Sequence, residues 1–139
     1  MFKNGYRNAK LNSDKVKNYV AHTIRGSIAE ENSVRVVHLM RELEDHILPQ
    51  MIICLIDFGL DFKKWRDRDS HNNSLHSIAL RKEYAKNNPD KKISLKNHHV
   101  KEAVELLIKS GVSYASKNKD GKVPSDYMTA DEMKYLIGK

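Results

Sequence analysis

A chain of 139 residues, 40% of them hydrophobic, can bury one core with little to spare, so we expect a single domain. The longest unbroken apolar run, residues 51–56, is far short of the ~20 residues that cross a bilayer, which excludes a membrane-spanning protein. The formal net charge of +7 favours an acidic partner: nucleic acid, anionic lipid or an acidic protein surface.

The N-terminus and the single cysteine bear on the cellular compartment. No apolar segment follows the charged first residues, so the sequence predicts no secretory signal and a cytoplasmic location. Cys54 is the only cysteine, which excludes an internal disulfide and a cysteine-based zinc site. Because Cys54 lies within the apolar run, we expect it in the core rather than as a nucleophile.

Apolar residues recur at helical spacing from residue 14 onwards. The first two predicted helices cover residues 14–28 and 33–44. Pro49 suits the first turn of a third helix, and Gly59 suits its C-terminal cap. Three helices joined by short connections are therefore expected before residue 60.

A fourth helical pattern begins at Ser74 and fades at residues 84–85. Residues 86–97 are polar and contain a proline, so they are predicted to form a loop. Three more helices are predicted after this loop, over residues 98–111, 124–128 and 131–137. The sequence therefore predicts an all-α fold.

Two segments repeat one pattern, an apolar helix followed by a glycine and a small, polar and aromatic exit. They are residues 51–62 and 103–114. We call the stretch that starts at each glycine a finger: the first finger is residues 59–71, and the second, two residues shorter, is residues 111–121. The repetition indicates two copies of one unit, and such units are stable only when they stack.

The repeated segments resemble the ankyrin repeat. Residues 73–79, Asn-Ser-Leu-His-Ser-Ile-Ala, resemble the Thr-Pro-Leu-His opening of its inner helix, and residues 104–113 resemble the end of its outer helix. Residues 120–126 resemble the start of a following repeat. The resemblance covers residues 51–128, with departures at Ser74, where the family has proline, and at His71, where it has glycine.

The resemblance implies stacked helical hairpins, an ankyrin-like solenoid with short turns between repeats, within one domain over residues 1–139. Residues 1–48 would form N-terminal helices or a cap, residues 49–119 the best-matching repeats with an insertion at 86–97, and residues 120–139 a C-terminal cap. It assigns structural roles to five residues: Gly59, His76, Gly111, Gly121 and Pro124. In the family, the histidine at the position of His76 hydrogen-bonds neighbouring turns.

The fingers carry the candidate binding residues. Four basic residues surround the only tryptophan in the first finger, and lysines recur at the corresponding place in the second, so both clusters are expected along one edge. Two interpretations of Trp65 stay open: an exposed anchor at a binding hot spot, or a ring folded back onto the stack. The candidate set is Lys64, Trp65, Arg66, Arg68, Arg81, Lys117, Asn118 and Lys119.

The sequence offers no candidate for catalysis or for a cofactor. Neither His71 with His76 nor His98 with His99 has the i, i+4 spacing that puts two metal ligands on one helix face. No nucleophile and base motif and no glycine-rich phosphate loop is present. We therefore expect no enzyme activity, no metal and no cofactor.

The resemblance implies a protein-binding module that uses its fingers and the concave face of its inner helices. The basic edge then favours a protein partner with an acidic surface. The alternative is a basic nucleic-acid-binding protein that contacts phosphates through its Lys and Arg clusters. The lysine- and asparagine-rich composition is compatible with an AT-rich genome, and the family's short, divergent members suggest a regulatory adaptor, acting in a host cell.

Overall fold

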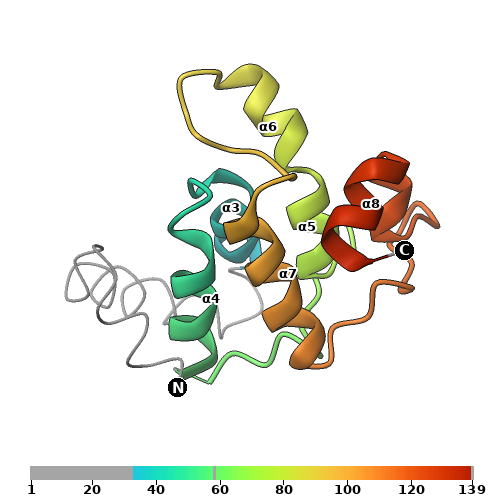
Figure 1. Ribbon diagram of the computed structural model, residues 1–139. Helices are drawn as coiled ribbons and strands as arrows, with labels where there is room; N and C mark the ends of the chain where they lie inside the picture. The colour runs from blue at the N-terminus through green and yellow to red at the C-terminus, as the bar shows by residue number, and fades with distance from the viewer. Residues whose placement is uncertain (1–32, 58, 139) are drawn as a thin grey trace.

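In the computed structural model, the described residues are 33–57 and 59–138, and all their regular elements are helical (Figure 1). The elements are α3 (Ser33–Glu42), α4 (Leu48–Asp57), α5 (Ser74–Ala79), α6 (Arg81–Asn87), α7 (His98–Lys109), the 3-10 helix η2 (Pro124–Tyr127) and α8 (Ala130–Ile137). The all-α prediction is confirmed for this part of the chain. The helix predicted over residues 14–28 lies outside the described residues.

Side chains of polar residues set the starts of three helices. The Asn73 amide oxygen accepts two N–H bonds at the first turn of α5, from residues 75 and 76, at 2.9 and 3.1 Å. The Asn97 amide oxygen accepts an N–H bond at 2.8 Å at the start of α7. Thr129 and Glu132 exchange bonds of 3.1 and 2.8 Å in a capping box at α8. These bonds satisfy N–H groups that have no partner within the helix.

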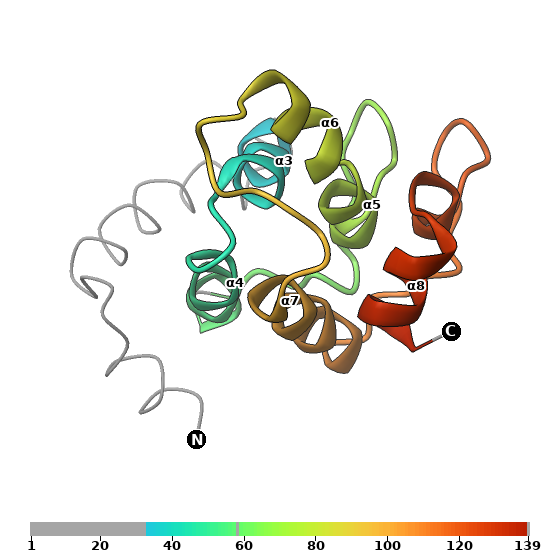
Figure 2. The same ribbon diagram turned by 45° about the horizontal axis from the view of Figure 1, so that its top comes forward.

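The helices pack in two rows. In the first row α3 packs against α5, and α5 against η2; in the second row α4 packs against α7, and α7 against α8. Figure 2 shows α4, α7 and α8 side by side, with α3 and α5 above them. Residues from both rows form one core, and Leu75 of α5 and Leu107 of α7 are both 0% exposed. Burying each such leucine contributes about 1.5–3 kcal/mol relative to leaving it in water.

The connection between α5 and α7 differs from the loop predicted for residues 86–97. The predicted fourth helix breaks at Leu80 into α5 and α6, and only residues 88–97 are non-helical. Ile93 and Leu95 within that stretch are 7% and 3% exposed, so the connection lies against the core. The sequence pattern missed this packing because two apolar residues in a polar segment carry no helical or strand periodicity.

A buried ion pair ties this connection to the segment between α3 and α4. The Arg81 side chain is fully buried and donates to Asp45 at 2.7 Å and to the backbone carbonyls of Met40 and Ser94 at 3.0 and 3.3 Å. Asp45 also accepts bonds from the N–H and hydroxyl of Ser94, at 2.9 and 2.6 Å. Burial lowers the pKa of Arg81, and the bond to Asp45 opposes that effect.

Candidate interaction surface

The two fingers leave their helices through the same cap. Gly59 after α4 and Gly111 after α7 have φ angles of +104° and +96°, which only glycine adopts at little cost. Each glycine N–H donates to the carbonyl three residues earlier at 2.9 Å, and the next N–H donates to the carbonyl five residues earlier at 3.0 Å. This pattern satisfies the last carbonyls of both helices. Both fingers therefore leave their helices with the same backbone conformation at the cap.

The tips of the fingers close with related hydrogen bonds. In the first finger, the Asp67 N–H donates to the Asn72 carbonyl at 2.8 Å; in the second, the Asn118 N–H donates to the Lys122 carbonyl at 2.8 Å. The side chains of Asp67 and Asn118 both accept N–H bonds from the turns that they begin. Polar side chains that bond their own backbone in this way favour tight turns over continued helix.

The two fingers are bonded to each other. The backbone N–H of Lys119 donates to the carbonyl of Ser70 at 2.8 Å, and the Arg66 guanidinium donates to the hydroxyl of Ser116 at 2.7 Å. The fingers are the green and orange loops at the upper right of Figure 2. Bonds between residues so far apart in sequence hold the side chains of both fingers in a fixed relation.

His76, at the start of α5, connects the ends of the two fingers. Its Nδ1 accepts the backbone N–H of Asn73 at 3.1 Å, and its Nε2 lies 2.8 Å from the carbonyl of Lys122. The neutral tautomer with the proton on Nε2 satisfies both bonds. The side chain is 0% exposed, and burial lowers the pKa of the imidazole.

Asn118 is a buried turn residue and not an exposed binding residue as the candidate set had it. Its side chain is 9% exposed, and its amide donates to the Asn72 side chain at 2.9 Å and to the Tyr127 hydroxyl at 2.8 Å. Its oxygen accepts the backbone N–H groups of Asp120 and Lys122 at 2.9 and 3.0 Å. A sequence signal was present, because Asn118 stands two residues before the Asp-Gly pair at 120–121, and these residue types are typical of turns.

Trp65 and Arg81 also lie inside the molecule. Trp65 is 8% exposed and belongs to the hydrophobic core, so of its two interpretations the folded-back ring is correct. Arg81 is 0% exposed and bonded to Asp45, which contradicts its place among surface candidates. Trp65 is buried because a large ring gains more from burial than from exposure at a turn. Arg81 is buried because it pairs with the carboxylate of Asp45, which the local sequence around Arg81 does not indicate.

The remaining candidates are exposed and lie on the fingers. We define the basic edge as Lys64, Arg66, Arg68, Lys117 and Lys119. Sequence reasoning left out Lys63 and Lys122, which are exposed in or beside the same fingers. The exposed acidic residues of the fingers are Asp61, Asp69 and Asp120, so basic side chains outnumber acidic ones there.

The first row of helices offers little surface at α5. All six residues of α5 are buried, including His76 and the two serines. The expectation of a binding face on the inner helices therefore fails at α5. The side chains of its cap residue Asn73 and of His76 instead bond the carbonyls of Ser113 in the second finger and of Lys122 just after it. The exposed charged side chains of this region lie on the fingers.

The part of the chain that the structure describes holds neither a cluster of metal ligands nor a helix that could cross a membrane. Within residues 33–57 and 59–138, no three or more His, Cys, Asp or Glu side chains are arranged to hold a metal ion. In the same residues, no helix combines the length and apolar composition that a bilayer crossing requires. Cys54 of α4 is half-buried and packs against the core.

Comparisons with known proteins add no relative from which a role could be transferred. No protein-family model matches the chain, and neither a curated protein nor a solved structure matches it. The functional argument therefore depends on the contacts and charges of the chain itself.

Proposed function

We propose that this chain is a protein-protein interaction module of the ankyrin type, which binds a partner through its fingers. Two features support the repeat assignment: the two rows of helices, and the shared cap at Gly59 and Gly111 that starts each finger. Stacked units of this kind expose their turns at one edge and bury their helical faces. The proposal includes an intracellular setting and a regulatory, host-directed adaptor role.

The observation that carries the proposal is the rigid support of the basic edge. The bond from the Lys119 N–H to the Ser70 carbonyl and the bond from Arg66 to Ser116 join the fingers that bear its cations. A preformed surface loses less conformational entropy when a partner binds. Its charge favours an acidic protein surface, increases the association rate at low salt and opposes basic partners.

Nucleic acid is the competing partner for a basic edge. Phosphate contacts need only cations, and on duplex DNA each contact lowers log K by about 0.9 per tenfold increase in salt. Single-stranded nucleic acid is usually held by aromatic rings on which bases stack. Trp65, the only aromatic residue among the basic residues of the first finger, is 8% exposed, which favours a protein partner.

A pair of charge-reversal variants tests the proposal. The double variant Lys117→Glu/Lys119→Glu changes the basic edge, and Lys86→Glu/Lys96→Glu makes the same change in net charge at exposed positions elsewhere. Each protein, immobilised, would be used to capture proteins from nuclease-treated extract of the source cells at low and high salt. Captured bands are identified by mass spectrometry, and circular dichroism verifies that both variants fold.

We expect specific proteins to bind the wild type and the control variant, and to be lost from Lys117→Glu/Lys119→Glu and at high salt. Equal capture by both variants would refute a role of the basic edge. A parallel gel shift with random-sequence DNA and RNA tests the competing partner. A shift at low salt that the finger variant abolishes, together with no captured protein, would assign the edge to nucleic acid instead.

A further inference from the structure

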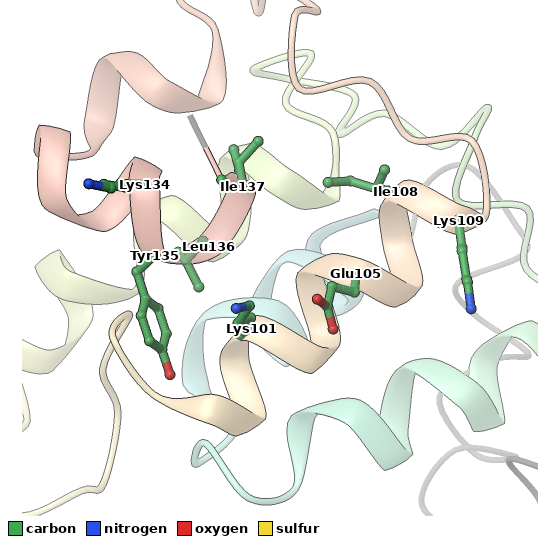
Figure 3. A pocket seen from close by; sticks show the side chains of 9 residues that line it. Lys101, Glu105, Ile108, Lys109, Lys134, Tyr135, Leu136 and Ile137 are labelled. Atoms are coloured by element: carbon green, nitrogen blue, oxygen red, sulfur yellow. The ribbon is translucent and has the colours of Figure 1, made fainter.

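A groove of about 600 Å³ lies between α7 and α8, at the end of the second row (Figure 3). Its apolar lining consists of Ile108 from α7 and of Tyr135, Leu136 and Ile137 from α8. Leu136 is 2% exposed, whereas the other three side chains are half-buried and still meet water. In Figure 3 the side chains of Ile108 and Ile137 extend toward each other from the two helices.

A second, smaller hollow of about 170 Å³ lies on the other side of α7, between α7 and α4. Ile53, Ile56 and Leu106 line it, and Lys109 lines both hollows. The two hollows therefore lie on either side of α7 and meet at Lys109, and Ile56 is the partly exposed apolar residue of the smaller one. A compact small molecule could fill only one hollow, whereas a peptide helix with a row of apolar side chains could fill both.

The charges around the larger groove are mainly positive. Lys101, Lys109 and Lys134 line it, against one carboxylate, that of Glu105. Lys109 and Lys134 are exposed, and Figure 3 shows their side chains extending away from the groove at opposite ends. The Lys101 ammonium lies 5.4 Å from the centre of the Tyr135 ring, which holds that cation beside the apolar lining.

We propose that this groove is a second docking surface, which binds an amphipathic helix whose apolar stripe is flanked by Asp and Glu. The apolar stripe buries against Ile108 and Ile137, and the acidic flanks face Lys101 and Lys134. Charge complementarity excludes a helix with basic flanks. The surface is formed by α7 and α8 and does not depend on the function proposed for the fingers.

Three synthetic peptides test the occupant. The first has leucines at the i, i+3, i+4 and i+7 positions of a helix and glutamates beside them; the second has the same residues in scrambled order; the third has lysines in place of the glutamates. Fluorescence anisotropy measures their binding to the full chain. We expect the Kd of the first peptide to be at least about tenfold lower than the Kd of either of the others. Equal binding of all three would overturn the proposal.

Two variants locate the bound peptide. Ile108→Gln removes an apolar wall and should weaken binding about tenfold, and Lys134→Glu, which changes no packing, should weaken it about fivefold. Lys86→Glu is the matched control on α6 and should change nothing. If Lys134→Glu and the control bind equally, the groove is not the site, even where Ile108→Gln has lost its fold.

Two more measurements separate this groove from the fingers and from self-association. The finger variant Lys117→Glu/Lys119→Glu should bind the peptide as the wild type does; a loss there would overturn the groove and leave the fingers as the site. Sedimentation equilibrium tests whether a second copy covers the groove. A dimer that Ile108→Gln dissociates would overturn the proposal in favour of self-association, and a monomer supports it.

Discussion

The two fingers begin alike and end differently. Both start at a glycine with a left-handed backbone and the same pair of hydrogen bonds, at 2.9 and 3.0 Å. At their tips, the second finger uses Gly121 with φ of +75°, whereas the first uses His71 with φ of +59°. A side chain in this region costs about 1–2 kcal/mol, a cost that glycine avoids.

The tip of the first finger, without a glycine, is held by a bond of its own and by a bond from the second finger. His71 donates its N–H to the Asp67 carbonyl at 2.8 Å, and Ser70 accepts the N–H of Lys119 at 2.8 Å. The second finger has glycine, Gly121, at its left-handed position. It also has the buried Asn118, whose side chain makes several hydrogen bonds. Exchanging the residues in which the two fingers differ therefore tests which contacts hold each of them.

The largest effect is expected at Asn118. Asn118→Ala removes the donors to Asn72 and Tyr127 and the acceptor for two N–H groups, so the free energy of unfolding should fall by about 3 kcal/mol. Asn118→Asp gives the second finger the residue type that the first has at Asp67; it keeps the acceptor and should cost less. Urea unfolding monitored by circular dichroism measures both.

Lys117→Ala is the matched control for Asn118→Ala, because it truncates an exposed neighbour and should change stability by less than about 0.5 kcal/mol. If Asn118→Ala unfolds at the same urea concentration as the control, the second finger does not depend on its buried amide.

The next effect concerns the glycines at which the fingers start. Gly111→Ala and Gly59→Ala each place a side chain on a left-handed backbone and should each cost about 1–2 kcal/mol. A Cβ at Gly111 would lie 2.7 Å from Cδ of Lys63 in the first finger, whereas a Cβ at Gly59 meets nothing within 4 Å. Gly111→Ala should therefore cost a few tenths of a kcal/mol more in urea unfolding, since the flexible lysine can move.

The double variant Gly111→Ala/Lys63→Ala isolates this contact between the fingers. It should remove the difference between the two glycine variants. If Gly111→Ala alone is no worse than Gly59→Ala, Lys63 moves aside at no cost.

Local sequence signals predicted more of the fold than of the binding surface. The helix ends at Gly59 and Gly111 and the turn at Asn118 follow from residues whose conformational preferences act within a few positions. The burial of Arg81 depends on Asp45, which is far away in sequence. Exposure of the basic edge could be predicted from charge, but burial of Trp65 could not, because it depends on packing between distant elements.

A smaller effect, of opposite sign, is expected at the tip of the first finger. His71→Gly gives this finger the residue type of the second and relieves the backbone cost at φ of +59°. Glycine also adds freedom to the unfolded chain, so the net gain should be about 0.5–1 kcal/mol in urea unfolding. Gly121→Ala is the reciprocal change and should destabilise. A loss of stability in His71→Gly would mean that the histidine side chain contributes more than its backbone costs.

The smallest effect is the pH dependence of the bond network at His76, where the two fingers meet. Burial holds the pKa of this imidazole below its ordinary value of 6.5, so the unfolded chain binds a proton at a higher pH than the folded chain. A proton on Nδ1 would face the N–H of Asn73, which that nitrogen accepts at 3.1 Å. The stability that His76 contributes is thus complete above pH 6.5 and decreases as the pH falls from there through the folded-state pKa.

Urea midpoints at pH 7.5 and pH 5.0 measure this dependence, which His76→Gln should reduce, because glutamine does not titrate. Burial also lowers the pKa of His99, whose contribution has the same sign, so the variant should retain a weaker slope instead of none. Equal slopes in wild type and variant would mean that His76 can be protonated in place. The two fingers would then be joined by the backbone bond at Ser70, by the bond from Arg66 to Ser116 and by Asn118, without a link that titrates in this pH range.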